Sequence, residues 1–560
     1  MKPIGKTLTL LLIFFCSSAA AQSTNVFIVQ FEDKENKVNA EDILSKKAIE
    51  RRLKFGIKLD EIDYPVNSQY VSAILKDTAI LLRYTLKWQN AAVVSADTQS
   101  LEHLKKIDFV KNVRYVGKAN KIRQVEKPKF QSPRIKLKES IMETKDLTAS
   151  DYGASYGQNN QIGIVELHQK GLNGRGVYIA IFDAGFKNIN SIPSFLKHQA
   201  NGKLMYGYDV AGLDNELNNS DNHGTSCLSC FGAYDKGKYI GSAPLANVIL
   251  FRTEFAATEY PVEELNWCKA AEQADSLGVD MITSSLGYNR FDDKSLSYTH
   301  KDLDGNTSYI SKSATIAVTK GIVVLNSAGN EGDDEWRKIG TPADVPSVIT
   351  VGAVGLDNIP GRFSSKGFNA EGIVKPDVSA CGVLATVASP NGGYYQGYGT
   401  SYATPIAAGG VACLLQAFPS LSPNEIANLV RATATQANNP DSSIGYGVAQ
   451  FDLAHNYQMA KNSQNELAKV LKIDDHQVVI YATKSEKIDY ELFYIKKFIG
   501  VFNIKKSKIK GTNVEESTLR RIDLNPKTKD CSKKYTLKIT IKTSVDNESL
   551  VFNDLSLCPL

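Results

Sequence analysis

The stretch Gly399-Thr400-Ser401-Tyr402-Ala403-Thr404-Pro405 contains the most informative residue of this chain, a serine between a glycine turn and an apolar segment. The apolar segment, Ile406 to Leu415, is predicted to be a helix. A serine at a helix N-terminus often serves only as a cap. It can also act as a nucleophile, but its hydroxyl is weak at neutral pH and then needs an adjacent base.

Two segments upstream contain the groups that such a serine needs. An apolar run, Ile179–Phe182, ends at Asp183, which places a carboxylate at the end of a predicted strand. His223 lies in Asp221-Asn222-His223-Gly224-Thr225-Ser226, just before a second predicted helix. The chain order Asp, His, Ser is one of the three orders known for Ser-His-Asp triads.

A fourth segment, Asn326-Ser327-Ala328-Gly329-Asn330, lies at the end of another predicted strand. On these four segments, in this order, the chain resembles the subtilases, the subtilisin-like serine proteases. The resemblance covers roughly Gly153 to Ala454. It implies a three-layer α/β fold and a secreted bacterial endopeptidase that hydrolyses peptide bonds through an acyl-enzyme on Ser401.

The resemblance also assigns a role to each residue. His223 is the general base toward Ser401, and Asp183 holds the imidazole in place. Asn330 is expected to donate its side-chain amide to the oxyanion, together with the backbone N–H of Ser401. Ser285-Leu286-Gly287 is expected to be an exposed edge that pairs with the substrate backbone. The alternative is a subtilase-fold protein that binds peptides with little catalysis, and the complete set of residues argues against it.

The chemistry requires no cofactor, and the identity of any metal site is left open. The loop from Tyr288 to Ser311 contains Asp302, Asp304, Gly305 and Asn306 and could bind calcium, although a solvated loop is the favoured interpretation. His223, Cys227 and Cys230 have a helical spacing that suits zinc, but no fourth ligand follows, and inward-packed cysteines are favoured.

The N-terminus has the pattern of a secretory signal peptide. Lys2 and Lys6 precede an apolar run, Leu8–Phe15, and small residues follow up to Ala21, after which cleavage is expected. The apolar run is too short to span a bilayer. The net charge of +5 over 560 residues favours neither nucleic acid nor a membrane surface as a partner. We therefore predict a secreted protein, extracellular or periplasmic, without a membrane span.

Residues 22–117 are predicted to form a small α/β unit with strands at 25–31, 86–95 and 110–116 and a helix at 98–107. This unit resembles the inhibitory propeptide of subtilases, so the chain is expected to be a zymogen whose own propeptide is an inhibitory partner. Residues 118–148 are rich in Lys and Arg and contain two prolines. They are predicted to be an exposed linker, with cleavage by the enzyme itself between Lys118 and Tyr156.

Residues 149–458 are predicted to be the catalytic domain. Apolar strands at 177–182, 247–251, 279–284, 322–326 and 348–354 alternate with helices such as 262–276 and 313–320. This alternation indicates a mainly parallel sheet that is covered by helices on both faces.

Residues 462–560 are predicted to be an all-β domain, with strands at 478–481, 490–494, 535–542 and 550–552. A surface- or glycan-binding role for it is an alternative that no cluster of aromatic residues supports. Seven cysteines remain after removal of the signal peptide, so at least one is unpaired. Cys413 is predicted to be a core residue, and Cys531 and Cys558 are predicted to form a disulfide.

Overall fold

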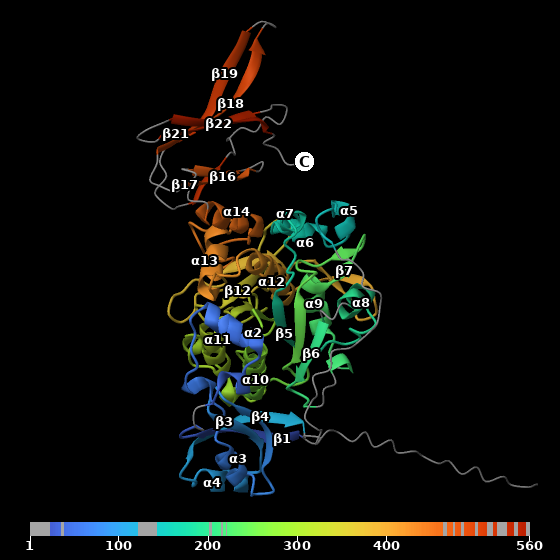
Figure 1. The fold of residues 1–560 in the computed structure, drawn as a ribbon, viewed down its shortest axis with the longest axis vertical. Coiled ribbons are helices and arrows are strands. Elements are labelled where there is room, and N and C mark those ends of the chain that lie inside the picture. The colour runs from blue at the N-terminus through green and yellow to red at the C-terminus, as the bar shows by residue number, and fades with distance from the viewer. Residues whose placement is uncertain are drawn as a thin grey trace, which may run out of the picture.

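The computed structural model describes residues 23–34, 38–120, 143–200, 204–213, 217–219 and 221–462, followed by strands between residues 468 and 555 (Figure 1). The predicted signal peptide, residues 121–142 of the predicted linker, and Cys531 and Cys558 lie outside these residues. The linker prediction is wrong at both of its ends, because residues 118–120 belong to the strand Val110–Asn120 and Thr144 and Leu147 are buried.

A seven-stranded sheet forms the centre of the catalytic domain. Every strand pairing in it is parallel, which confirms the predicted α/β class. The sequence prediction missed β6, which a glycine interrupts, and β13. The strands, in their spatial order, are β13 (Val378–Cys381), β12 (Ile349–Val354), β11 (Val323–Ser327), β10 (Met281–Ser284), β5 (Tyr178–Asp183), β9 (Asn247–Arg252) and β6 (Leu204–Asp209).

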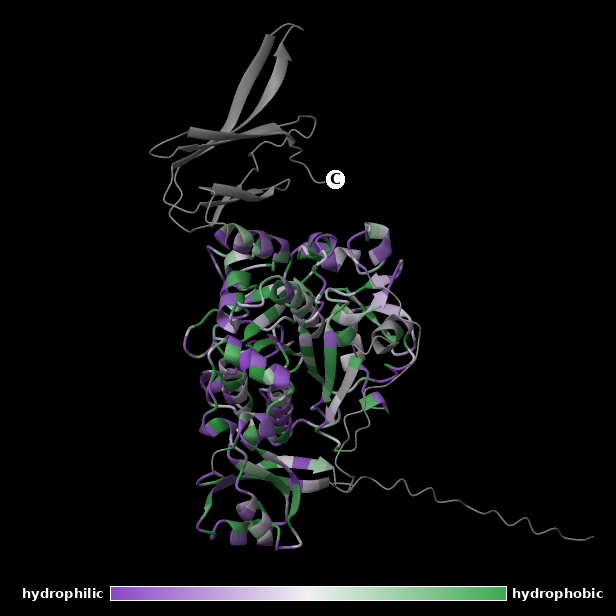
Figure 2. Ribbon diagram, in the orientation of Figure 1, coloured by the Kyte–Doolittle hydropathy of each residue, from purple (hydrophilic) through white to green (hydrophobic). Residues whose placement is uncertain are grey.

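Helices cover both faces of this sheet, so the domain has three layers. On one face α9 (His223–Gly232) and α12 (Thr400–Ala417) pack with the strands into one large apolar cluster. On the other face α10 (Pro261–Leu277) and α11 (Tyr309–Thr319) form a second cluster. Hydrophobic residues gather along the central strands (Figure 2). Further helices are α5 (Ala149–Tyr152), α6 (Tyr156–Gln161), α7 (Ile164–Gln169), α8 (Pro193–Ala200), α13 (Pro423–Thr433) and α14 (Phe451–Asn462).

The N-terminal unit contains a four-stranded antiparallel sheet; two of its helices cover one face of this sheet, and another packs against α10 of the catalytic domain. Its strands, in spatial order, are β2 (Leu81–Leu86), β3 (Ala91–Ser95), β1 (Ser23–Phe31) and β4 (Val110–Asn120). The predicted single strand at 86–95 is wrong. The chain instead turns between β2 and β3, and Asn90 takes a left-handed φ of 48° that closes the hairpin. The helices are α1 (Ala40–Ile43), α2 (Lys46–Lys54), α3 (Ser68–Ile74) and α4 (Thr98–Leu104).

This unit lies against the helices on the second face of the catalytic domain (Figure 1). Tyr84 of β2 and Trp88 in the turn after it share an apolar cluster with Trp267 of α10. The other side of the sheet has its own core, which includes Phe27, Val29 and Leu104. The N-terminal unit therefore buries two separate surfaces, one internal and one against α10.

After α14 the chain continues in β-strands that form two sheets. Among the helices that the structure describes, none has the length and apolar character needed to cross a bilayer. The C-terminal strands are β16 (Ala468–Ile473), β17 (Gln477–Ala482) and β20 (Leu519–Asp523) in one sheet, and β19 (Phe502–Gly511), β18 (Lys487–Phe498), β21 (Tyr535–Lys542) and β22 (Asn547–Leu555) in the other.

Candidate active site

The candidate residues gather at one edge of the central sheet. Asp183 is the last residue of β5, and Ser285-Leu286-Gly287 and Ala328-Gly329-Asn330 directly follow β10 and β11. The strands are parallel and adjacent, so their carboxyl ends meet at the same edge, where α/β proteins bind their ligands.

Asp183 and His223 are in direct contact. Nδ1 of His223 lies 2.8 Å from Oδ1 of Asp183, which also accepts a hydrogen bond from the amide of Ala184. His223 is the first residue of α9 rather than the residue before it. Gly224 allows this approach, because a Cβ atom there would lie 2.5 Å from the carbonyl oxygen of Gly185 and 2.8 Å from Cβ of Asp183.

The carboxylate of Asp183 sets the charge state of the histidine. Burial alone would lower the pKa of His223, but the contact with Asp183 outweighs burial and raises this pKa well above its usual range.

Sγ of Cys227 lies 3.7 and 3.9 Å from the two ring nitrogens of His223 and 3.3 Å from the carbonyl oxygen of Ser401. Cys227 therefore touches both the histidine and the segment that carries the serine. Burial raises the pKa of the Cys227 thiol, so the group is neutral at physiological pH.

Ser401 lies in the first turn of α12, inside the helix rather than ahead of it. The first backbone N–H groups of a helix have no partner within the helix and carry partial positive charge. In this structure the Ser401 hydroxyl donates a 3.4 Å hydrogen bond to the carbonyl oxygen of Ser285. The hydroxyl of Ser285 in turn donates to the Ser401 carbonyl at 2.8 Å. These two bonds join the start of α12 to the segment that follows β10.

Asn330 is oriented by the residue that precedes the serine. Its Oδ1 accepts hydrogen bonds from the backbone N–H and the hydroxyl of Thr400, both at 3.0 Å. The oxygen of the amide is thereby held on α12, which leaves the NH₂ group available as a donor. Gly329 has a φ of +107°, a conformation that favours glycine, and it turns the chain from β11 into this position.

Ser285, Leu286 and Gly287 border a cavity of about 210 Å³ that also reaches Asn330 and Ser401. The edge is exposed at Gly287 as predicted, whereas Ser285 is buried because it bonds to the start of α12. Among the described residues, the backbone N–H of Gly287 has no backbone partner, so it is free to pair with an extended peptide. The structure thus brings the predicted substrate edge, the serine and the asparagine amide to one cleft.

Three glutamates of this cleft were missed by sequence reasoning. Glu254 follows β9, Glu259 precedes α10, and Glu331 follows Asn330 in the chain. All three line the cavity beside Ser401. The same strand-end rule that located Asp183 could have found Glu254, because β9 is the direct neighbour of β5.

The two predicted alternatives for metal binding have other contacts in the structure. Cys230 is buried in the apolar cluster, and its Sγ donates to the carbonyl oxygen of Ser226. In the loop after β10, the carboxylate of Asp302 accepts from Thr299, and Asp304 accepts from the amides of Asn306 and Thr307. Calcium binding by this loop stays a prediction.

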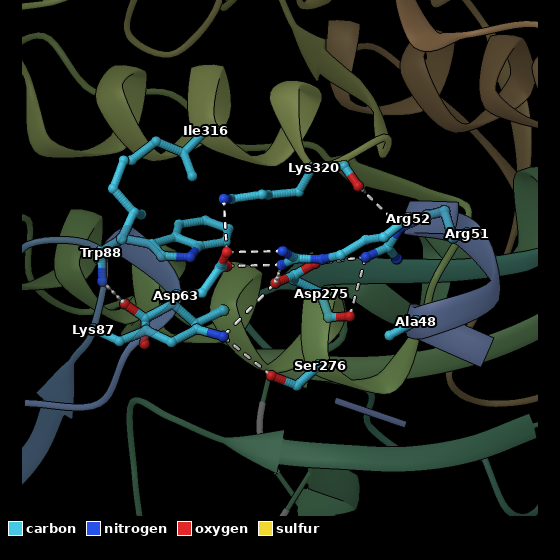
Figure 3. Close-up of polar contacts among 12 residues, drawn as sticks. Ala48, Arg51, Arg52, Asp63, Lys87, Trp88, Asp275, Ser276, Ile316 and Lys320 are labelled. Atoms are coloured by element: carbon cyan, nitrogen blue, oxygen red, sulfur yellow. Dashed lines mark hydrogen bonds and ion pairs between the residues drawn. The ribbon is translucent and has the colours of Figure 1, made fainter. Parts of the chain in front are cut away.

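A buried charge network joins the N-terminal unit to the catalytic domain (Figure 3). Arg51 of α2 donates to the carbonyl oxygens of Lys320 (3.1 Å), Val279 (2.6 Å) and Asp275 (3.2 Å), and to Oδ1 of Asp275 (2.5 Å). These acceptors lie at the C-terminal ends of α10 and α11, where unpaired carbonyl groups carry partial negative charge. The arginine therefore faces an environment that favours a cation.

Arg52 extends the network back into its own unit. It donates to both oxygens of Asp63, at 2.8 and 2.9 Å, and to Oδ2 of Asp275 at 2.7 Å. Nζ of Lys320 lies 3.0 Å from Asp63 on the other side. Burial would raise the pKa of Asp63, but Arg52 and Lys320 hold it well below its usual range. The charged side chains of this network are at most 4% exposed: Arg51, Arg52, Asp63 and Asp275. They are therefore stabilised by ion pairs and hydrogen bonds with one another and not by solvation.

Comparison with known families agrees with this geometry. Residues 174–447 match the subtilase family of Peptidase S8, and residues 26–132 match the Peptidase S8 propeptide domain of Bacteroidota. The serine protease AprX of Bacillus subtilis is 30% identical over 305 residues, which span 49% of this chain and 65% of that protein. Subtilisin E of the same species is 30% identical over 321 residues, 54% of this chain and 71% of subtilisin E.

A solved structure of MycP1, with its N-terminal propeptide removed, is 24% identical over 53% of this chain and 97% of that one, with a TM-score of 0.42. The sequence relatives define the present chain as a serine-type endopeptidase with an N-terminal propeptide domain. It belongs to the subtilase family.

Proposed function

We propose that this protein is exported as a zymogen and hydrolyses peptide bonds through an acyl-enzyme on Ser401. His223 takes the proton of the serine hydroxyl and later gives it to the leaving amine, while Asp183 holds the imidazole and stabilises its charged form. The 2.8 Å contact between Asp183 and His223, in the same cleft as Ser401 and Asn330, carries this proposal. The catalytic step requires the Ser401 hydroxyl to turn from the Ser285 carbonyl toward His223.

Asn330 and the first turn of α12 supply the stabilisation of the transition state. The NH₂ group of Asn330 and the backbone N–H of Ser401 converge on the carbonyl oxygen that becomes negative during attack. Thr400 holds the asparagine before the substrate arrives, so little reorganisation is needed during the reaction. The extended substrate pairs with Ser285-Leu286-Gly287 as an added strand.

The N-terminal unit acts as an inhibitor until it is cut from the catalytic domain. A parallel sheet forms slowly because its pairings are non-local, and a unit that covers α10 and α11 assists that step. Residues up to Asn120 belong to β4, and Thr144 is buried and donates to the carbonyl oxygen of His168. The cleavage site is therefore expected between these two points, within residues 121–142.

The decisive experiment replaces Ser401 with alanine and uses the exposed Ser191→Ala as the matched control. We expect Ser401→Ala to lose casein hydrolysis and fluorophosphonate labelling, and to accumulate with its N-terminal unit attached in mass spectra. The Ser191→Ala protein should process, label and cleave like the wild type. Labelling and hydrolysis of Ser401→Ala at the wild-type rate would place the nucleophile elsewhere. Mass spectrometry of protein from the culture medium also tests export and cleavage after Ala21.

A further inference from the structure

Acidic side chains line the cavity beside Ser401. Glu254, Glu259 and Glu331 line it together with the segment Ser285–Gly287 and Gly340. Arg290, a nearby cation on the same loop as Tyr288, is paired with Asp334. Among the described residues, none of the three glutamates forms an ion pair with a lysine or arginine.

The hydrogen-bond partners of these carboxylates, where they have any, are uncharged groups. The hydroxyl of Tyr288 donates a short hydrogen bond to Glu254, and Ser365 donates to Glu331 at 2.8 Å. The side chain of Glu259 has no hydrogen-bond partner among the described residues. Burial, reinforced by the neighbouring carboxylates, raises the pKa of Glu259 to about 8, and burial raises that of Glu254 to about 7. The cavity is therefore lined by acidic groups that have no lysine or arginine partner among the described residues.

The loop that presents these groups is fixed in place. Glu263, in the first turn of α10, accepts hydrogen bonds from the amides of Phe255 (2.8 Å) and Tyr260 (3.1 Å), which closes the loop around Glu259. The carboxylate oxygens of Glu254, Glu259 and Glu263 lie within 4.8 Å of one another. Because both oxygens of Glu263 already accept backbone donors, Glu254 and Glu259 are the groups with capacity for a further cation.

We infer that this cavity selects a lysine or arginine side chain of the substrate, next to the peptide bond that Ser401 attacks. The inference rests on the proposed function, since it assigns a substrate class to the same cleft. A cationic side chain that enters beside Ser401 contacts Glu259 and Glu331 directly. Its charge favours the ionised form of these carboxyl groups, which burial alone would keep protonated. Charge-assisted hydrogen bonds of this kind contribute both strength and direction.

The chain's own linker has the complementary charge. Gly117, near the end of β4, packs directly against the side chain of Tyr260, the residue after Glu259, and Lys118 interacts electrostatically with Asp293. The linker thus begins beside the acidic cavity. Eight basic residues follow within 21 positions: Lys118, Lys121, Arg123, Lys127, Lys129, Arg134, Lys136 and Lys138. A cleft that takes a basic side chain therefore has this stretch as its first substrate.

The test compares peptides that differ at the single position before the cleaved bond: arginine, its uncharged isostere citrulline, lysine, leucine and glutamate. The mature wild-type enzyme, quantified by fluorophosphonate titration, should show a kcat/KM for arginine about 10- to 100-fold above that for citrulline, the range for hydrogen bonds to charged groups. Equal rates for arginine and citrulline, or a preference for leucine, would overturn the inference while labelling by fluorophosphonate still upheld the proposed function. No labelling at all would refute the proposed function itself.

Variants then assign the preference to the cavity. Glu259→Gln and Glu331→Gln keep the shape of the side chain, and each should lower the arginine-to-citrulline ratio by roughly tenfold. Glu166→Gln, on the exposed surface of α7, is the matched control and should leave the ratio unchanged. A ratio that neither cavity variant alters would also refute the inference. So would tight calcium binding to the Ser401→Ala protein that the Glu259→Gln change abolishes, because the cation would then be a metal ion.

Discussion

Replacing Arg51 with alanine in the N-terminal unit should release the inhibitor from the catalytic domain. Arg51 is 3% exposed and donates to four acceptors, all of them in the catalytic domain. Removing one partner of a buried ion pair costs about 3–5 kcal/mol. Arg52 still compensates Asp275 in the variant, so we expect the lower part of this range. Since 1.4 kcal/mol is a factor of ten, the inhibition constant should rise about 10²- to 10³-fold.

The assay measures inhibition of the mature enzyme by the separately produced N-terminal unit, which has its own core around Phe27 and Val29. Lys46→Ala is the matched control, because Lys46 is on the same helix with its side chain 93% exposed and should change the constant by less than about twofold. The loss from Arg51→Ala should persist at high salt, since buried charges are weakly screened. An Arg51→Ala unit that inhibits as well as Lys46→Ala would refute the assignment of the buried network as the anchor.

Three further predictions concern the active site and the C-terminal domain. Asn330→Ala should lower kcat about 10²- to 10³-fold with little change in KM, because the donor acts on the transition state; a raised KM with unchanged kcat would instead make it a binding residue. Activity requires neutral His223, and because its pKa is raised, kcat/KM should rise with pH at a midpoint above the usual histidine pKa. Asp183→Asn should move this midpoint down toward about 6.5 and lower kcat about 10⁴-fold. A pH profile of the variant with an unchanged midpoint would contradict this. A Cys531–Cys558 bridge would close about 27 residues and stabilise the terminal domain by about 3 kcal/mol, and peptide mapping without reductant should recover the linked pair rather than free thiols.

The sequence alone predicted the parts of this protein that depend on local pattern. The apolar runs of β5, β10 and β11 and the residues at their ends were enough to place Asp183 and Asn330 on one edge of the sheet. The turn at Asn90 was missed because apolar, strand-like residues on both sides were joined across it, although Asn90 is itself a residue that favours turns. Ser401 was placed ahead of its helix, whereas the helix starts at Thr400. In both cases the choice between turn, helix and strand depends on tertiary contacts.

The docking of the two domains could not be predicted, for a different reason. The sequence of α2, Lys-Lys-Ala-Ile-Glu-Arg-Arg-Leu-Lys, is typical of a solvated surface helix. Arg51 and Asp275 are separated by 224 positions, and neither shows a local sign of burial. Among the glutamates of the cleft, a strand-end position marks Glu254 as a candidate, but nothing in the sequence places Glu259 beside it and Glu331. Only the fold shows that these charges are withdrawn from water.

The charge network also restricts how this protein can diverge over generations. Cleavage of the linker leaves Arg51 and Arg52 on one piece and their shared acceptor Asp275 on the other, yet a single gene encodes both. An inhibitor domain from another lineage, with an apolar residue in place of Arg51, would bury Asp275 beside α2 with only part of its compensation. A substitution at either position therefore weakens the docking unless the other position changes with it. We expect Arg51 and Asp275 to be inherited together, so that each propeptide recognises its own protease and fails on those of its neighbours.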